Sequence, residues 1–193
     1  YKYSKKLMPL VHLPIQSGSD RILNLMNRKH TIKEYLSVYE RLKEINSSIM
    51  FSSDFIIAYP EENENDFNMT FDLIKKLKFI NSYSFVFSPR PGTVASKFKL
   101  IDKDVSFQRL EKIQKQLFSN QIEMNKSLEG QIINVLVENQ TKDKTKLFGR
   151  SEYMTSVILD GNKNNIGEVV KVKVLNSNRN NLFGEIVKNL KVA

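Results

Sequence analysis

The chain has 193 residues, 40% of them hydrophobic, and a formal net charge of +9 at pH 7. Its length suits one large domain or two small ones, and no apolar run approaches the roughly 18–20 residues that a membrane-spanning helix needs. The sequence has no cysteine and two histidines, which excludes disulfides, thiolate metal sites and a cysteine nucleophile within this chain. We therefore expect neither a catalytic residue nor a metal ligand here.

The first 126 residues alternate between short apolar strands and amphipathic helices. We expect strands over 7–15, 49–58 and 82–87, and helices over 20–26, 31–46, 67–78 and 104–126. Thr31 and Glu34 form a capping box at the start of the second helix, whereas Pro9 and Pro14 make the first strand irregular. This alternation indicates a parallel sheet with right-handed crossovers. Three such units make half of a small barrel, so one sheet edge is expected to be bare.

Polar residues at the carboxyl ends of these strands form the first candidate site. Residues 16–19 (Gln-Ser-Gly-Ser) suit a ribose or a carboxylate, but Ser19 would equally well only cap the next helix. Arg28 suits a carboxylate or is a solvated cation at a helix end. Asp54 interrupts an apolar strand, and because a buried carboxylate needs a partner, it binds either a ligand or a neighbouring strand or loop.

Two further loops, 59–62 and 88–93, follow the second and third strands and should lie on the same face as Gln16. Arg90, in the second loop, is placed to reach a phosphate or a carboxylate. Ordinary turn chemistry explains both loops equally well. His12 and His30 are expected to pack or cap rather than to bind a ligand.

After about residue 127 the pattern changes to short strands separated by turns rich in asparagine and glycine. Five strands are expected, over 131–138, 147–150, 156–159, 168–175 and 182–187. Strands this short and closely spaced suggest a small all-β barrel of OB-like type. We therefore divide the chain into an α/β domain, 1–126, and a β-barrel domain, 127–193.

Basic residues interleaved with aromatic ones on this barrel suit contacts to RNA. The candidates are Arg150, Lys171, Lys173 and Arg179. Both parts of the chain are basic, which favours a polyanionic partner such as nucleic acid. A solvated surface and a lysine-rich composition are the alternative explanation.

Several motifs together resemble one enzyme family. They are His12–Leu23, Met26–Thr31, Ser53–Ile57 and Tyr83–Thr93. These stretches are similar to the tRNA methylthiotransferases of the radical S-adenosylmethionine (SAM) superfamily, especially the branch that makes 2-methylthio-isopentenyladenosine beside the tRNA anticodon. The resemblance implies that the first domain is the C-terminal half of a radical SAM partial (βα)6 barrel and that the second is a TRAM domain.

The resemblance also implies cofactors and partners. It assigns SAM binding to Gln16, Arg28 and Asp54, and it gives complete family members two [4Fe–4S] clusters held by cysteines that this chain lacks. The chain would supply part of the SAM pocket and the tRNA-docking barrel in the cytoplasm, away from any membrane. It would need a missing N-terminal half, in the same or a separate chain, and would be inactive alone. A fragment, a split gene product and a decayed, non-catalytic RNA-binding remnant all fit.

One loop departs from the family pattern. Where the family has Gly-Phe-Pro-Gly-Glu-Thr after the fifth strand of its barrel, this chain has Ala58–Asn63, so both glycines are replaced. Glycine adopts left-handed backbone conformations readily, and other residues do not. We therefore expect an altered backbone in a loop that faces the cofactor.

Overall fold

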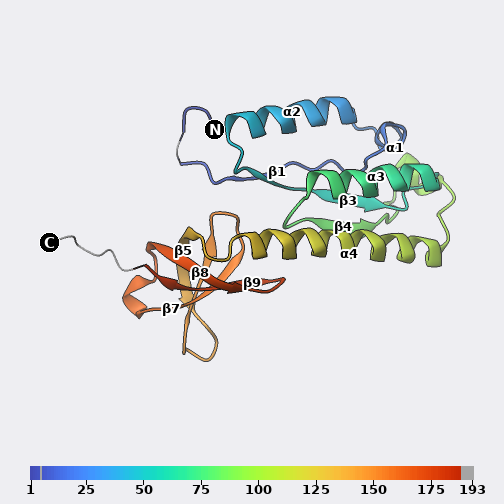
Figure 1. Ribbon diagram of the computed structural model, residues 1–193. Helices are drawn as coiled ribbons and strands as arrows, with labels where there is room; N and C mark the ends of the chain where they lie inside the picture. Colours follow the sequence, from blue (N-terminus) through green and yellow to red (C-terminus); the bar gives the residue numbers. More distant parts are fainter. Residues whose placement is uncertain (5, 188–193) are drawn as a thin grey trace. The chain divides into compact units, whose positions relative to one another are not determined.

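The structure is a computed structural model that describes residues 1–4 and 6–187 (Figure 1). The chain groups into two compact units, Tyr1–Asn120 and Gln121–Ala193, and helix α4 (Lys103–Ser127) runs across their boundary. The domain division at 126/127 stays a prediction. Within the described residues, no helix combines the length and the apolar character that crossing a bilayer requires.

The first unit alternates strands and helices, as the sequence predicts. Its elements, besides α4, are β1 (Leu10–His12), α1 (Asp20–Leu25), α2 (Ile32–Ile45), β2 (Met50–Ser52), β3 (Asp54–Ile57), α3 (Glu64–Leu77), β4 (Tyr83–Val86) and the short 3-10 helix η1 (Val94–Lys97). The predicted capping box at Thr31 is confirmed. A second box, at Asn63, starts α3 three residues earlier than predicted.

These strands form a small parallel sheet. β1 pairs with β2, β3 pairs with β4, and a bridge between Gln16 and Phe55 joins the two pairs. β1 is shorter than predicted because Pro9 and Pro14, which flank it, have no N–H to donate. Within the described residues, β1 and β4 each pair on one side only, so the sheet is open, as half of a barrel requires.

The single strand predicted over 49–58 is interrupted at Ser53, and the prediction is corrected there. Side chains replace the backbone ladder at this point. The Ser53 hydroxyl accepts a hydrogen bond from Ile15 N (2.9 Å), and Ser53 N donates to the Ser82 hydroxyl (2.9 Å). The interruption separates β2 from β3 without changing their direction.

The helices cover one face of this sheet and leave the other open. The covered face and the helices share a core that includes Ile15, Tyr35, Phe51, Phe55, Ile57, Phe67, Ile74, Ile113 and Leu117. Figure 1 shows α2 and α3 running alongside the strands. Side chains at alternate strand positions point the other way, and on β4 these are Tyr83 and Phe85, which are 63% and 55% exposed.

The second unit contains a closed five-stranded barrel, which confirms the predicted barrel (Figure 1). Its strands are β5 (Ile132–Gln140), β6 (Leu147–Ser151), β7 (Ser156–Asp160), β8 (Val169–Ser177) and β9 (Asn181–Ile186), with the 3-10 helix η2 (Lys163–Asn165) between β7 and β8. The order around the barrel is β5-β6-β7-β9-β8, and β7 and β9 run parallel.

Alternate residues of these strands fill the barrel interior, among them Val135, Val172 and Leu182, which are fully buried. Two strand glycines make so small a barrel possible. A Cβ at Gly149 or Gly184 would lie 2.4 or 2.5 Å from a backbone carbonyl oxygen of the neighbouring strand. The strands can therefore approach closely only without a side chain at these positions.

Candidate functional site

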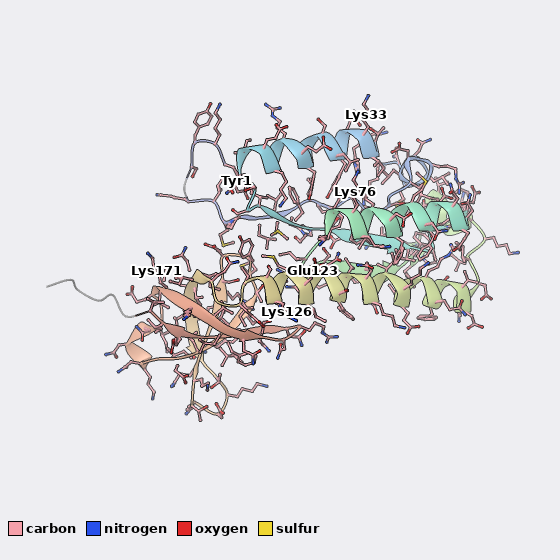
Figure 2. The ribbon with its side chains drawn as sticks, viewed as in Figure 1. Tyr1, Lys33, Lys76, Glu123, Lys126 and Lys171 are labelled. Carbon is pink, nitrogen blue, oxygen red and sulfur yellow. The ribbon has the colours of Figure 1, made fainter. Side chains whose placement is uncertain are left out.

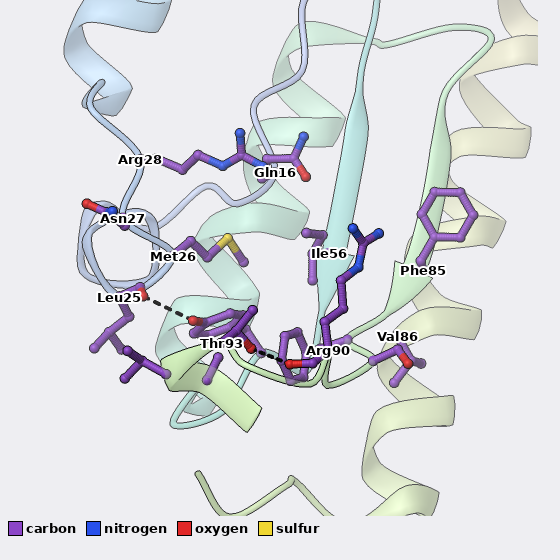
Figure 3. A pocket seen from close by; sticks show the side chains of 15 residues that line it. Gln16, Leu25, Met26, Asn27, Arg28, Ile56, Phe85, Val86, Arg90 and Thr93 are labelled. Atoms are coloured by element: carbon purple, nitrogen blue, oxygen red, sulfur yellow. Dashed lines mark hydrogen bonds between the residues drawn. The ribbon is translucent and has the colours of Figure 1, made fainter. Parts of the chain in front are cut away.

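A cavity of about 690 Å³ opens at the carboxyl ends of the strands of the first unit (Figure 3). Its lining comes from the turn after β1, the end of α1, β3 and β4, and the loop after β4. This is the edge where the sequence predicts a site, because parallel α/β folds bind ligands there. The volume falls within the roughly 300–1,000 Å³ of small-molecule pockets.

Gln16 reaches this cavity through an unusual backbone turn. Its φ of 73° lies in the left-handed region, which residues other than glycine rarely adopt. Two hydrogen bonds hold the turn, from Gln16 N to Asp54 O (3.0 Å) and from Ile56 N to Gln16 O (2.9 Å). Gln16 is buried, and within the described residues its amide has no hydrogen-bond partner. A free donor and acceptor is thus fixed at the cavity wall.

Arg28 enters the cavity from the end of α1. Asn27, with φ of 57°, turns the chain out of the helix, and Arg28 N donates to Leu23 O (2.9 Å). The exposed guanidinium has no partner in the part of the chain that the structure describes. Figure 3 shows it extending towards Gln16. The structure therefore brings together two of the three residues that the resemblance assigns to SAM.

Asp54, the third of these residues, lies apart from the cavity lining. It stands at the start of β3, and its Oδ2 lies 3.4 Å from Nε2 of His12, whose Nδ1 is 2.8 Å from the Ser52 hydroxyl. The expectation that Asp54 is buried is wrong, since its side chain is 32% exposed. The reason is that Asp54 points to the uncovered face of the sheet, where solvent reaches it. Its assignment to SAM stays a prediction.

The other polar residues of the turn, 17–19, hold the fold together. The Ser19 hydroxyl caps α1 and donates to Oδ1 of Asp66 (2.6 Å), and the Ser17 hydroxyl lies 3.3 Å from that of Thr70. A Cβ on Gly18 would lie 2.6 Å from the Cα of Thr70, so the glycine lets α3 pack directly on the turn. The sequence leaves two uses open for this turn, ligand binding and helix capping. Ser19 caps α1, and of residues 16–19 only Gln16 lines the cavity.

Asp66 joins this turn to α3. Burial favours a raised pKa for Asp66, but hydrogen bonds from Arg21, Ser19 and the backbone of Asn63 outweigh it, so its pKa is lower than usual. The carboxylate therefore stays charged, and it ties α1 to the first turn of α3.

The loop Ala58–Asn63 has a left-handed backbone at both positions where the family pattern has glycine. Ala58 has φ of 56° and Glu61 has φ of 69°, so both residues that replace a glycine adopt the left-handed conformation. The expected change of backbone relative to the family stays a prediction. Tyr59, in this loop, lines the cavity and donates from its hydroxyl to Leu25 O (3.0 Å).

A buried ion pair that the sequence analysis missed fastens this loop. Oε1 of Glu62 accepts from Ala58 N (3.1 Å) and from Arg109 of α4 (2.9 Å), and Arg109 also bonds Glu62 O (3.0 Å). Burial raises the pKa of Glu62 to about 7, although these hydrogen bonds and the guanidinium oppose the rise. Glu62 matches the glutamate of the family's loop motif, and that match is the signal that would have found it.

On the barrel, three of the four predicted RNA-binding residues share one outer face. Arg150 of β6 lies opposite Leu136 of β5, and Lys171 and Lys173 of β8 lie opposite Asn134 and Ile132 of the same strand. Their partners on β5 are every second residue of that strand, and alternate residues of a strand point to the same side of the sheet. The three basic side chains therefore share one face. Lys171 is exposed, and Figure 2 shows it on the outside of the barrel.

Apolar side chains share this face with the cations: Ile132, Leu136, Val169 and Leu175 are all exposed. Arg150 lies 5.8 Å from the ring centroid of Phe148 and 3.4 Å from Oε1 of Glu138. Arg179 lies elsewhere, in the turn between β8 and β9, where its carbonyl accepts from the Asn125 amide (3.0 Å). Because Arg179 is not on a strand, the strand register does not place it on the same face as the other three.

Comparison with known proteins matches both parts of the chain to families. Residues 2–74 match the model of the Radical SAM superfamily, and residues 126–187 match the TRAM domain. A protein of Pelagibacter ubique (strain HTCC1062) is 67% identical over 99% of this chain and 43% of its own length. A protein of Ruthia magnifica is 44% identical over 97% of this chain and 42% of its own length. A protein of Orientia tsutsugamushi (strain Boryong) is 42% identical over 96% of this chain and 42% of its own length.

All three relatives are named tRNA-2-methylthio-N(6)-dimethylallyladenosine synthase. The chain spans less than half of the length of each. The open sheet, the closed barrel and the two matched families agree with the fold that the motifs imply. Over almost all of its length, the chain is therefore similar to a part of the radical SAM tRNA methylthiotransferases, with a Radical SAM match followed by a TRAM match.

Proposed function

We propose that this chain is the part of a tRNA methylthiotransferase that completes the SAM pocket and docks the tRNA. The complete enzyme would install a methylthio group on isopentenyladenosine beside the anticodon. The observation that carries the proposal is the convergence of Gln16 and Arg28 on one cavity at the carboxyl ends of a parallel sheet. The names of the relatives agree with it.

The two side chains suit SAM by their chemistry. The planar guanidinium of Arg28 can bind a carboxylate through two parallel hydrogen bonds, and the amide of Gln16 can donate to or accept from a ribose hydroxyl. In such enzymes, one-electron reduction of bound SAM by an iron–sulfur cluster would supply the 5′-deoxyadenosyl radical that takes hydrogen from adenine C2. The resemblance also gives Asp54 to SAM, and this chain holds that carboxylate beside His12.

The iron–sulfur clusters of the family do not fit the residues of this chain. The clusters need cysteine thiolates, and the sequence has none. Within the described residues, no three side chains of histidine, aspartate or glutamate gather as metal ligands would. We propose that the missing N-terminal half, in the same or a separate chain, supplies the clusters and that this chain alone does not turn over SAM.

The barrel supplies the proposed docking surface for tRNA. Arg150, Lys171 and Lys173 share its outer face with exposed apolar side chains. Cations neutralise phosphates, and apolar surface suits unstacked bases. Arg179, in the β8–β9 turn, is a separate candidate contact. A tRNA partner would place the protein in the cytoplasm.

Titration of SAM into the full chain, followed by calorimetry, tests the cofactor part of this proposal. Arg28→Gln removes the carboxylate contact and should weaken SAM binding roughly tenfold, since charged hydrogen bonds contribute about 1.5–3 kcal/mol. Arg41→Gln is the matched control, because Arg41 is exposed on α2 and does not line the cavity. Equal affinity of the Arg28 variant and the wild type would refute the assignment.

The absence of cysteine favours a second candidate, a non-catalytic RNA-binding module. Such a module would bind tRNA with a steep dependence on salt and would not bind SAM. The DNA upstream of the coding region separates the two candidates further. An in-frame half that carries the cysteines supports the enzyme, and a stop codon or a frameshift supports the remnant or an enzyme split over two chains.

A further inference from the structure

The cavity has more positive charge than one SAM molecule can use. Arg28 and Arg90 both line it, and none of the described lining residues is acidic. SAM has one carboxylate, and its ammonium and sulfonium groups are themselves cations. If one arginine pairs with the carboxylate of SAM, the other has no anion from the cofactor. An uncompensated positive charge in a partly enclosed site attracts a second anion strongly.

Arg90 is presented to the cavity by a turn with a fixed backbone. Thr93 N and the Thr93 hydroxyl both donate to Arg90 O, at 3.2 and 2.8 Å. Pro91 and Gly92, which has φ of 82°, occupy the central positions that suit them in a type II turn. Within the described residues the guanidinium has no partner, and Figure 3 shows it rising beside Ile56.

An aromatic side chain lines the same cavity as this arginine. Phe85 lines the cavity and stays more than half exposed. Its ring stacks with that of Tyr83, with 6.4 Å between the centroids and 12° between the planes. Exposed aromatic rings beside a cation are the pattern by which proteins hold single-stranded nucleic acid, one base on the ring and its phosphate on the cation.

We propose that Arg90 binds a phosphodiester of the substrate RNA while Phe85 stacks under the adjoining base, so that one nucleotide shares the cavity with SAM. The inference rests on the proposed function, and it names a residue in the first unit that would contact RNA independently of the barrel. Arg28 and Arg90 then divide two anions between them, the carboxylate of the cofactor and the phosphate of the substrate.

The test uses the full chain with Lys171→Gln and Lys173→Gln as a background that weakens RNA binding to the barrel. The probes are the trinucleotide ApApA and its methylphosphonate analogue, whose linkages carry no charge, and binding is followed by NMR at residues 85–93. Adding Arg90→Gln should weaken ApApA at least fivefold and reduce the slope of log affinity against log salt by about 0.7. The uncharged analogue should bind both proteins equally.

Two further variants separate charge from stacking. Phe85→Leu should weaken both probes, because it removes the ring that both would stack on, and Arg41→Gln should weaken neither. Equal binding of ApApA with and without Arg90 would overturn the inference. A loss of SAM affinity in the Arg90 variant as large as the loss of ApApA affinity would also overturn it, because Arg90 would then hold the cofactor.

The same experiment keeps this inference apart from the proposed function. If SAM affinity depends on Arg28 but ApApA affinity does not depend on Arg90, only the inference fails. If SAM affinity does not depend on Arg28, the proposed function fails, whatever the trinucleotide does.

Discussion

Ala58 and Glu61 hold backbone conformations that normally belong to glycine. A left-handed residue with a Cβ is disfavoured by roughly 1–2 kcal/mol, and both lie in the loop that follows β3. The loop keeps this backbone because it is fastened from several sides, by the Glu62 carboxylate and the Tyr59 hydroxyl among others. Local strain of this kind persists where the surrounding contacts determine the conformation.

The Glu62 carboxylate makes the stability of the protein depend on pH. Burial raises its folded-state pKa to about 7, from an ordinary value of 4.5. The folded protein therefore binds this proton more tightly than the unfolded chain, and the free energy of unfolding should fall by roughly 1–3 kcal/mol as pH rises from about 4.5 to about 7. Glu62→Gln should remove this part of the profile, measured by urea unfolding at several pH values.

Asp66→Asn gives the matched comparison, since the pKa of Asp66 is shifted the other way. The stabilising contribution of Asp66 is present above its ordinary pKa of 3.8 and is lost as pH falls below it. This variant should therefore change mainly the acidic end of the profile. It should keep most of the slope between 4.5 and 7, because the charge of Asp66 is the smallest of the causes that shift the pKa of Glu62. A Glu62→Gln protein that keeps the wild-type slope in that interval would contradict the assignment.

Close packing between α3 and the turn after β1, residues 16–19, depends on Gly18. The Cβ of an alanine there would lie 2.6 Å from the Cα of Thr70, and backbone atoms cannot move aside as the end of a side chain can. Gly18→Ala should therefore destabilise the first unit by about 1–3 kcal/mol, as overpacking does. It should also displace Gln16 from the cavity wall and weaken SAM binding. Urea unfolding and SAM titration measure the two effects.

Gly92→Ala separates this clash from simple backbone strain. Gly92 has φ of 82°, but a Cβ there meets nothing within 4 Å. It should therefore destabilise the unit by about 1 kcal/mol, less than Gly18→Ala does. Equal losses for the two variants would mean that contact with α3 is not the reason for the glycine at position 18.

Local signals predict the elements well where they are strong. The capping box at Thr31 and the alternation of the barrel strands are read directly from neighbouring residues, so α2 and the barrel are predicted correctly. The break at Ser53 is not, because it depends on hydroxyl contacts with residues 38 and 29 positions away. Contacts this distant along the chain leave no periodic pattern.

The candidate site divides in the same way. Gln16 and Arg28 are found because the resemblance supplies their spacing, and the cavity contains both. Asp54 is wrongly expected to be buried because an apolar run does not reveal which face of a strand the helices cover. Arg109 is missed because its partner, Glu62, lies 47 residues earlier in the chain.

At the scale of the whole molecule, the net charge of +9 would serve the proposed tRNA docking only where the cations face the RNA together. Lys171 and Lys173 share the outer face of the barrel, whereas Lys33 and Lys76 are exposed on α2 and α3 (Figure 2). Both pairs contribute the same formal charge. If general charge attracts tRNA, the two pairs matter equally, and if the barrel face docks it, they do not.

The double variant Lys171→Gln, Lys173→Gln tests this difference against Lys33→Gln, Lys76→Gln. Each lysine that contacts a phosphate releases counterions, so losing both barrel lysines should make the slope of log affinity against log salt less steep by about 2. The helix pair should leave the slope almost unchanged, because screening beyond about 10 Å removes long-range attraction at 0.1 M salt. Fluorescence titration of labelled tRNA at roughly 50–300 mM salt measures the slopes of both double variants, because an interval of about this width separates such slopes. Equal slopes for the two double variants would show that the tRNA responds to total charge, and the barrel face would lose its assignment.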